Sequence, residues 1–326
     1  MRAVIITPDS QLLVEERPDP VAGAGEVLVR VHGAGLNRGD LAQRAGFYPA
    51  PPGAPPDIPG MEFAGEVVGL GPGVERWTIG DQVFGLTGAG AQAELLAVNA
   101  EHCVALPPTL DLVTAGGVPE AFVTAHDAMF TIADTSRGDT VLVSAVGSGV
   151  GTTALQLAKA AGCTVVGTAR SPEKLERCRE LGLDHAVLAP RELDPVALAD
   201  EIVAAAGPVD VALELVGGNY LITDVRAAAP LGRIVLIGLV AGTRAELDVS
   251  MVMVKRLRVQ GTTLRGRDAA QKAAAVAAFS RDVVPLLASS DVAPVIARSM
   301  PIDDAGEAYD LLATDSVFGK LVLDLT

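Results

Sequence analysis

The chain has 326 residues, of which 49% are hydrophobic and 20% are charged, and its formal net charge at pH 7 is -15. Because a single hydrophobic core rarely grows beyond about 250 to 300 residues, this length predicts two domains. The composition excludes a disordered chain. The acidic balance argues against a general nucleic-acid surface and against an anionic membrane as partner.

No segment has the pattern of an export signal or a membrane span. Met1 to Ile6 is too short for a signal-peptide core and meets Pro8 at once, so it is interpreted as a first strand. The most apolar internal run, Ile234 to Ala241, falls far short of the ~20 residues that a spanning helix needs. The three cysteines form no C-x-x-C pair, and the four histidines lack metal-ligand spacing. We therefore expect a soluble, cytoplasmic protein without a metal.

Residues 1 to about 120 are rich in glycine and proline, and their apolar runs are short. Glu26 to Val31 alternates polar and apolar residues, as half-buried antiparallel strands do. Turns such as Pro51 to Gly53 and Gly71 to Gly73 separate these runs. The pattern predicts a β-rich, barrel-like domain.

From Thr140 onward, short apolar runs alternate with helical patterns, which is typical of βαβ units and a parallel sheet. The expected strands are Val141 to Val146, Thr164 to Ala169, His185 to Leu188, Val209 to Leu215, Arg233 to Gly238 and Leu257 to Thr263. The expected helices begin near Val150, Pro172, Asp194 and Asn219. Six strands make two mononucleotide-binding halves, so the sequence predicts an α/β, doubly wound sheet of the Rossmann type.

The end of the chain adds too little for a third domain. It consists of an Ala-rich helix from Asp268 to about Ser290, a helix near Asp303 to Ala313 and a last strand from Lys320 to Leu325. We expect residues 1-122 and 266-326 to form a catalytic domain and residues 123-265 a dinucleotide-binding domain, with a small ligand in the cleft between them. The sixth strand would be an edge for a second subunit, which predicts a homodimer.

The run from Thr140 to Gly151 is the most informative stretch. A β-branched strand ends in small residues and leads directly into a helix. Backbone N-H groups and the helix dipole at such a junction make a pyrophosphate cradle. A strict G-x-G-x-x-G fingerprint would need glycines at Val146 and Ser148, and only Gly151 falls on the pattern. A tight turn that binds no nucleotide is therefore the alternative.

The end of the second strand indicates which dinucleotide. NAD-preferring folds place an acidic residue about 20 positions after the Gly-rich turn. Here the strand is followed by Arg170 and Ser171, with Lys174 one helical turn further on. Two cations attract an adenosine 2'-phosphate, so the pattern favours NADPH. The alternative is that Arg170 and Lys174 are a solvated helix start.

Several motifs together resemble the medium-chain dehydrogenase/reductase superfamily. They are Asn37-Arg38-Gly39-Asp40, Gly46-Phe47-Tyr48, Pro59 to Gly65, Gly80 to Phe84, Pro119 to Ala125 and Gly319 to Leu323. The chain is similar over its whole length to the zinc-independent quinone oxidoreductases, in particular the zeta-crystallin-like, stress-induced branch. This resemblance implies that the first domain is a GroES-like catalytic domain.

The resemblance also implies metal-free chemistry. Zinc-containing relatives have a cysteine where this chain has Asn37 and a histidine where it has Met61, and neither an amide nor a thioether is a useful zinc ligand. Without a Lewis acid, the favoured acceptors are already electron-poor. A quinone or a conjugated enone accepts a hydride directly.

The resemblance assigns residues to both ends of the reaction. It implies Asn37, Asp40 and Tyr48 as the catalytic set, with Tyr48 over the substrate as a proton donor or hydrogen-bonding group. A packing aromatic is the alternative for Tyr48, and a surface charge is the alternative for Arg191. The implied cofactor-binding residues are Thr124 at the nicotinamide, Ser148, Gly149, Val150 and Gly151 at the pyrophosphate, Arg170, Ser171 and Lys174 at the 2'-phosphate, Arg191 near the adenine, Gly238 and Leu239 at the ribose, and Leu264, Phe318 and Lys320 around the pocket.

Three functions fit these observations. The first is NADPH-dependent reduction of quinones or α,β-unsaturated carbonyls. The second is reduction of enoyl thioesters, and the third is a non-catalytic NADPH-binding structural or sensor role. The sequence does not indicate the physiological hydride acceptor or the choice between one-electron and two-electron transfer.

Overall fold

The computed structural model describes all 326 residues, and the chain divides into two compact units. Unit 1 comprises Met1–Val123 and Leu264–Thr326, and unit 2 comprises Thr124–Thr263. None of the helices combines the length and the apolarity that a bilayer crossing requires.

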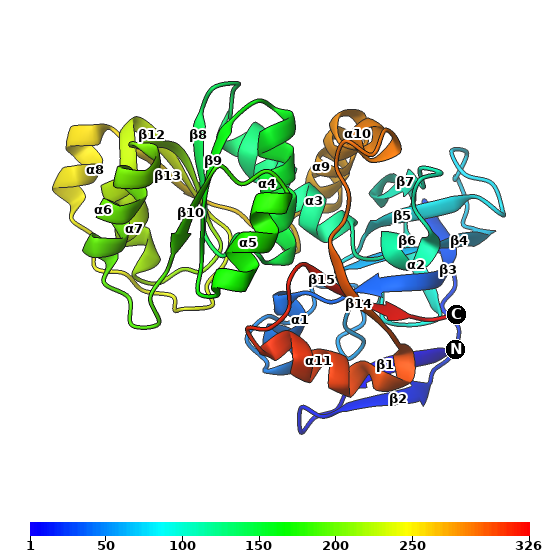
Figure 1. Ribbon diagram of the computed structural model, residues 1–326. Coiled ribbons are helices and arrows are strands. Elements are labelled where there is room, and N and C mark those ends of the chain that lie inside the picture. The colour runs from blue at the N-terminus through cyan, green and yellow to red at the C-terminus, as the bar shows by residue number, and fades with distance from the viewer. The chain divides into compact units, whose positions relative to one another are not determined.

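Unit 2 is built on a parallel six-stranded sheet of order β10-β9-β8-β11-β12-β13. Figure 1 labels β8, β9, β10, β12 and β13 of this sheet. The strands are β8 (Thr140–Val143), β9 (Thr164–Ala169), β10 (His185–Leu188), β11 (Val209–Glu214), β12 (Ala228–Leu236) and β13 (Arg258–Gly261). This order is the Rossmann order, so the predicted doubly wound sheet is confirmed. β8 ends earlier than predicted because Ala145 adopts a left-handed φ of 47° and turns the chain out of the sheet.

Helices flank this sheet on both sides, with α4 and α5 on one side and α6 and α7 on the other (Figure 1). They are α4 (Gly149–Ala160), α5 (Pro172–Glu180), α6 (Pro195–Ala206), α7 (Tyr220–Ala227) and α8 (Val249–Lys255), with a π-helical turn η2 (Asp127–Ile132). Ser148, Ser171 and Asp194 each cap the following helix by accepting from a first-turn N-H. The sequence did not predict α8, because no residue of this short helix is buried.

Unit 1 contains a largely antiparallel sheet of order β14-β15-β3-β4-β5-β7, with β6 also paired to β3, and a separate β1-β2 hairpin. The strands are β1 (Arg2–Ile6), β2 (Leu12–Glu16), β3 (Glu26–Gly35), β4 (Glu62–Leu70), β5 (Gln82–Leu86), β6 (Leu95–Asn99), β7 (Cys103–Ala105), β14 (Ile296–Pro301) and β15 (Lys320–Asp324). Val27, Val29 and Val31 point into the core, as the alternation predicted. The predicted β-rich, GroES-like fold of this part is confirmed.

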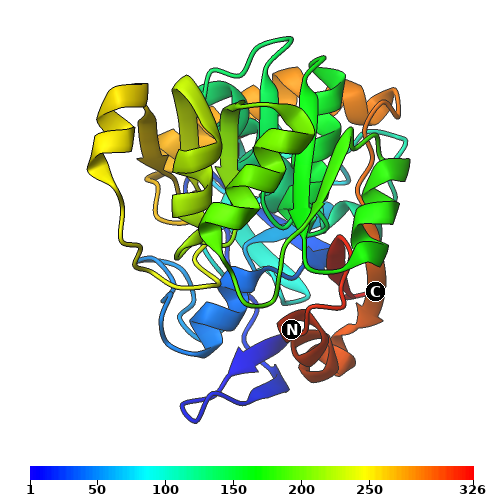
Figure 2. The same ribbon diagram turned by 60° about the vertical axis from the view of Figure 1, so that its left-hand side comes forward.

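Short helices complete unit 1. They are α1 (Arg38–Arg44), α2 (Leu112–Ala115), α3 (Pro119–His126), α9 (Ala269–Asp282), α10 (Val284–Ala288) and α11 (Ala305–Ala313), with 3-10 turns η1 (Ala100–His102) and η3 (Ile302–Asp304). α3 begins in unit 1 and ends in unit 2. Figure 2 shows α11 beside the β1-β2 hairpin, so segments from both ends of the chain pack together.

Candidate functional site

The Gly-rich turn between β8 and α4 is tightly packed. Ser148 caps α4, because its Oγ accepts a hydrogen bond from the backbone N-H of Gly151 at 3.1 Å. A Cβ on Gly151 would lie 2.5 Å from the carbonyl oxygen of Ala145, so no side chain fits there. The N-terminal end of a helix of three turns thus meets a bare main-chain turn, an arrangement that fits a pyrophosphate.

The end of β9 carries the residues expected at a 2'-phosphate. Arg170 is exposed, and Ser171 caps α5 by accepting from the N-H of Lys174 at 3.2 Å. The Ser171 hydroxyl also donates to Glu173 Oε2 at 2.6 Å, which lowers the pKa of that carboxyl. No sequence motif had singled out Glu173. Two cations, a hydroxyl and a carboxylate therefore gather at this helix start.

The same edge of the unit 2 sheet carries the ends of β11 and β12. Gly238 follows β12, and a Cβ there would lie 2.1 Å from the carbonyl oxygen of Leu215, so only glycine fits. Leu239 is exposed beside it, and Arg191 is exposed after β10. Because the carboxyl ends of parallel strands share one edge, the structure brings most of the predicted dinucleotide residues together within unit 2. Thr124 lies on α3, where unit 2 begins.

A buried carboxyl pair supports this edge, and sequence reasoning missed it. Glu214 ends β11, and its Oε1 accepts from the N-H groups of Val216 and Gly217. Burial raises the pKa of Glu214 and of Asp224 on α7, and the negative charge of Glu214 raises that of Asp224 further. Asp224 therefore keeps its proton and shares it with Glu214. The signal that could have found this pair is Glu214, an acidic residue at the end of the apolar run of β11.

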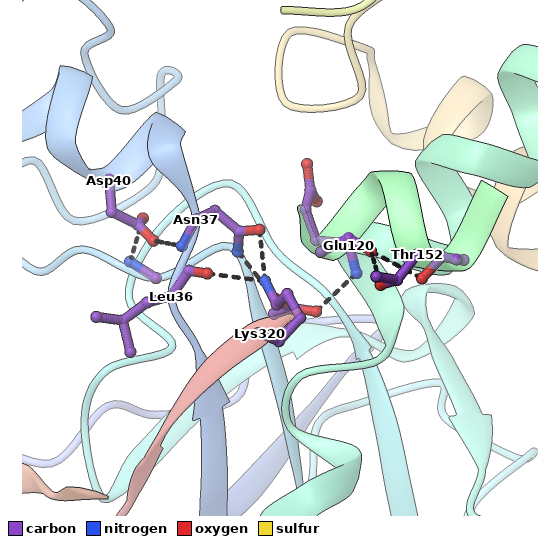
Figure 3. A network of polar contacts seen from close by, with 10 residues as sticks. Leu36, Asn37, Asp40, Glu120, Thr152 and Lys320 are labelled. Carbon is purple, nitrogen blue, oxygen red and sulfur yellow. Dashed lines mark hydrogen bonds and ion pairs between the residues drawn. The ribbon is translucent and has the colours of Figure 1, made fainter. Parts of the chain in front are cut away.

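Lys320 is the centre of a polar network inside unit 1 (Figure 3). Its Nζ donates to the Leu36 carbonyl at 2.8 Å, to Asn37 Oδ1 at 2.7 Å and to Glu62 Oε1 at 2.5 Å. The Asn37 amide also donates to Glu62 Oε1 at 2.9 Å. An ammonium has three donors, so this network occupies all of them. Lys320, expected at the cofactor, has none left for it.

Two further carboxyls surround this network. Asp40 is fully buried and accepts from the N-H groups of Asn37 at 2.8 Å and Gly60 at 3.2 Å, and burial raises its pKa to about 6. The Glu120 N-H donates to Glu62 Oε2 at 2.8 Å. Burial and the charge of Glu62 raise the pKa of Glu120 to about 8, so Glu120 holds a proton at neutral pH. Both glutamates lay inside recognised motifs, but sequence alone did not single them out.

Tyr48 is half-buried and lies against Arg265. The Arg265 guanidinium donates to the Tyr48 carbonyl at 2.8 Å, and its Cζ lies 4.8 Å from the centre of the Tyr48 ring. Nothing in the sequence distinguished Arg265 from the exposed arginines. Leu264 and Phe318 are buried. No group of three or more His, Cys, Asp or Glu side chains with the geometry of a metal site occurs in the chain.

Comparisons with known proteins agree with this architecture. The model for the alcohol dehydrogenase GroES-like domain matches residues 23–108, and that for zinc-binding dehydrogenase matches residues 149–279. The quinone oxidoreductase of Rattus norvegicus is 30% identical over 93% of this chain and 90% of its own length. Prostaglandin reductase-3 of Mus musculus is 30% identical over 94% of this chain and 83% of its own length.

Two more similarities extend the comparison. The Spectinabilin polyketide synthase system protein NorB of Streptomyces orinoci is 31% identical over 94% of this chain, which corresponds to only 14% of that protein. The Escherichia coli quinone oxidoreductase complexed with NADPH superimposes with a TM-score of 0.87 over the full length of both chains, at 23% identity. At that identity the likeness concerns the fold.

Proposed function

The chain belongs to the medium-chain dehydrogenase/reductase superfamily and is an NAD(P)-dependent oxidoreductase, and from this premise we propose that it reduces quinones or α,β-unsaturated carbonyls with NADPH and without a metal. The observation that carries the proposal is the glycine cradle at the start of α4 together with the cations Arg170 and Lys174 after the neighbouring strand.

The residues of unit 2 would hold NADPH by its charged parts. The turn at Gly151 and the N-terminus of α4 take the pyrophosphate, and Arg170 and Lys174 take the 2'-phosphate. The Ser171 hydroxyl, which here donates to Glu173, would be able to donate to that phosphate instead, and Glu173 would remain at the helix N-terminus, where a carboxylate is stabilised. Bound NADPH supplies the hydride.

Unit 1 supplies the residues for the acceptor. The Asn37 amide is hydrogen-bonded to Glu62 and Lys320, so it orders the polar network. Tyr48 provides the proton: one hydride and one proton convert a quinone to a hydroquinone, or an enone to a ketone. The O-H bond of the phenol breaks as its proton goes to the acceptor, and the phenolate left behind takes a proton from water.

The test is nicotinamide oxidation by the purified chain with NADPH or NADH and a panel of quinones, enones and enoyl thioesters. Turnover of quinones or enones with NADPH supports the proposal. Faster turnover of thioesters favours enoyl-thioester reduction, the alternative supported by the match to part of a polyketide synthase protein. NADPH binding without any turnover would identify a structural or sensor protein.

We also propose a homodimer formed through β13. This strand is the exposed edge of the unit 2 sheet, and every residue from Arg258 to Gly261 is exposed. The preceding helix α8 leaves Met253 72% and Val254 80% exposed. A second copy fits this face, because two β13 strands can pair about a twofold axis and bury both apolar patches.

The three cysteines of the chain are free thiols, which is compatible with a reducing cytoplasm.

A further inference from the structure

Arg265 is a buried cation with no carboxylate hydrogen-bonded to it. Only 3% of the residue is exposed. Its guanidinium donates from Nε to the Gly88 carbonyl at 2.7 Å, from one terminal nitrogen to the Tyr48 carbonyl at 2.8 Å, and from the other to Gln43 Oε1 at 2.5 Å. All three acceptors are neutral, so hydrogen bonds satisfy the fork without a direct ion pair, and the negative charge of the nearby Asp40 only partly offsets the cost of burying the guanidinium. Burial accordingly lowers the pKa of Arg265.

The same guanidinium lies over an aromatic ring. Its Cζ is 4.8 Å from the centre of the Tyr48 ring, within the range of a cation–π contact. Arg265 therefore touches Tyr48 twice, at the main chain and at the ring. The two contacts fix both where the loop lies and how the phenol is turned. The backbone of Tyr48 has a further contact, because its N-H donates to the Ala42 carbonyl at 3.2 Å.

Gly39 makes room for this arrangement. A Cβ at Gly39 would lie 2.7 Å from the Met61 methyl and 3.5 Å from Cδ1 of the Tyr48 ring. The ring thus has a close neighbour on α1 in addition to the guanidinium. An aromatic ring that only covered the core could be packed by apolar side chains. Placing a guanidinium over it costs the hydration of a charge.

We propose that Arg265 is the positioning residue for Tyr48: it holds the phenol in place and its positive charge stabilises the phenolate that remains after proton donation. The second half of this statement rests on the proposed function; the first half does not. In the step, the O-H bond of Tyr48 breaks, the proton goes to the anionic oxygen or carbon of the reduced acceptor, and water later restores the phenol. Charge over the ring favours this transfer because it stabilises the product state.

Ultraviolet absorbance of tyrosinate during an alkaline titration reads this interaction without any substrate. The chain has three tyrosines, and burial raises the pKa of Tyr220 and of Tyr309. The Tyr48→Phe variant identifies the signal of Tyr48 by subtraction. In Arg265→Met the midpoint of that signal should rise by about one pH unit or more. Arg265→Lys keeps the charge without the fork and should give an intermediate midpoint.

Kinetics separates this inference from the proposed function. With quinone and NADPH, Arg265→Met should lower kcat at least about tenfold, because positioned proton transfer contributes about 10²-fold or more. The Kd of the Arg265→Met variant for NADPH should change less than about threefold. Such a change corresponds to well under the 1.4 kcal/mol of a tenfold effect. Arg44→Met is the matched control: it removes a guanidinium that donates to the Ser10 carbonyl in the same unit, and it should leave both readouts unchanged.

An identical Tyr48 midpoint in wild type and Arg265→Met, with circular dichroism showing both folded across the titration, would overturn the inference. A raised midpoint with unchanged kcat would keep Arg265 as the residue that holds Tyr48 but remove Tyr48 from the proposed reaction. If Arg265→Met fails to fold, Arg265→Lys decides: a midpoint equal to that of wild type together with wild-type kcat contradicts the positioning role.

Discussion

Lys320 and Arg170 show how the surroundings of a side chain decide what a positive charge does. Lys320 is buried, and its ammonium donates hydrogen bonds to Leu36, Asn37 and Glu62. Arg170 is exposed at the end of β9, where a ligand can reach it. Both were predicted to bind the cofactor, but only the exposed one has the access that a phosphate requires.

The first prediction concerns the 2'-phosphate. The double variant Arg170→Glu, Lys174→Glu should weaken NADPH binding about 100-fold, since each lost charge-assisted contact costs about 1.5 kcal/mol or more. NADH lacks the phosphate, so its Kd should change less than about threefold. Calorimetric titration measures both. Arg177→Glu, in the last turn of the same helix, controls for net charge. Equal losses for the two coenzymes would contradict the phosphate assignment.

The second prediction concerns the carboxyl pair in unit 2. Because burial raises the pKa of Asp224 above its usual value, the native state holds a proton that the unfolded state releases. The free energy of unfolding therefore falls as pH rises from about 4 toward the raised native pKa. Asp224→Asn cannot ionise and can still donate to Glu214.

This variant should be more stable than wild type at about pH 8, by on the order of 1 kcal/mol, and the gain should shrink toward about pH 4. Urea unfolding at a series of pH values measures it. Asp200→Asn, at an exposed position on α6, is the control. Parallel stability profiles for wild type and Asp224→Asn would show that no proton is held at this position.

At the scale of elements, the junction of β8 with α4 matters more than any single group in it. The Oγ of Ser148 accepts a hydrogen bond from the N-H of Gly151, so Ser148 stabilises the start of α4. The N-H of Val146 donates to the Thr168 carbonyl at 2.9 Å, which ties the turn to the next strand. The shape of the turn therefore depends on both flanking elements, and a small side chain at Gly151 would change it.

The third prediction tests this junction. Ser148→Ala should cost about 1 kcal/mol of stability through the lost cap, with little change in coenzyme affinity. Gly151→Ala should weaken NADPH and NADH alike, by about tenfold or more, because its Cβ would displace carbonyls at 2.5 and 2.7 Å from the pyrophosphate turn. Gly306→Ala, on α11 with open space around its Cβ, is the matched control. Normal affinity in Gly151→Ala for both coenzymes would exclude this turn as the pyrophosphate site.

For the whole molecule, the edge of the unit 2 sheet bears on assembly. The unit 2 sheet ends in β13, whose outer side has no partner strand within the chain. Exposed apolar residues of α8 directly precede it in the sequence. An uncovered edge beside an apolar patch favours self-association.

The fourth prediction follows from this face. The double variant Met253→Lys, Val254→Lys should halve the molecular mass measured by light scattering, because four buried charges would oppose the dimer. Val21→Lys, at an 87% exposed valine of unit 1, should leave the mass unchanged. A wild-type chain that already scatters as a monomer would rule out the dimer.

Local sequence patterns were sufficient to predict the alternation of strands and helices in unit 2 apart from α8, the parallel sheet and the Gly-rich turn. These depend on local signals: β9 and β10 are short, mostly apolar runs, and Ser171-Pro172 starts α5 where capping chemistry requires. The predicted ends were less accurate where a turn conformation decided them, as at Ala145.

The roles of the charged side chains, in contrast, depend on contacts between distant parts of the chain. Lys320 pairs with Glu62 from 258 positions away, and Arg265 reaches Gln43 across 222 positions and lies over the Tyr48 ring. No local pattern encodes such contacts, because burial and charge pairing arise only when distant segments pack together. Whether a cation serves a ligand or the core is therefore a property of the fold.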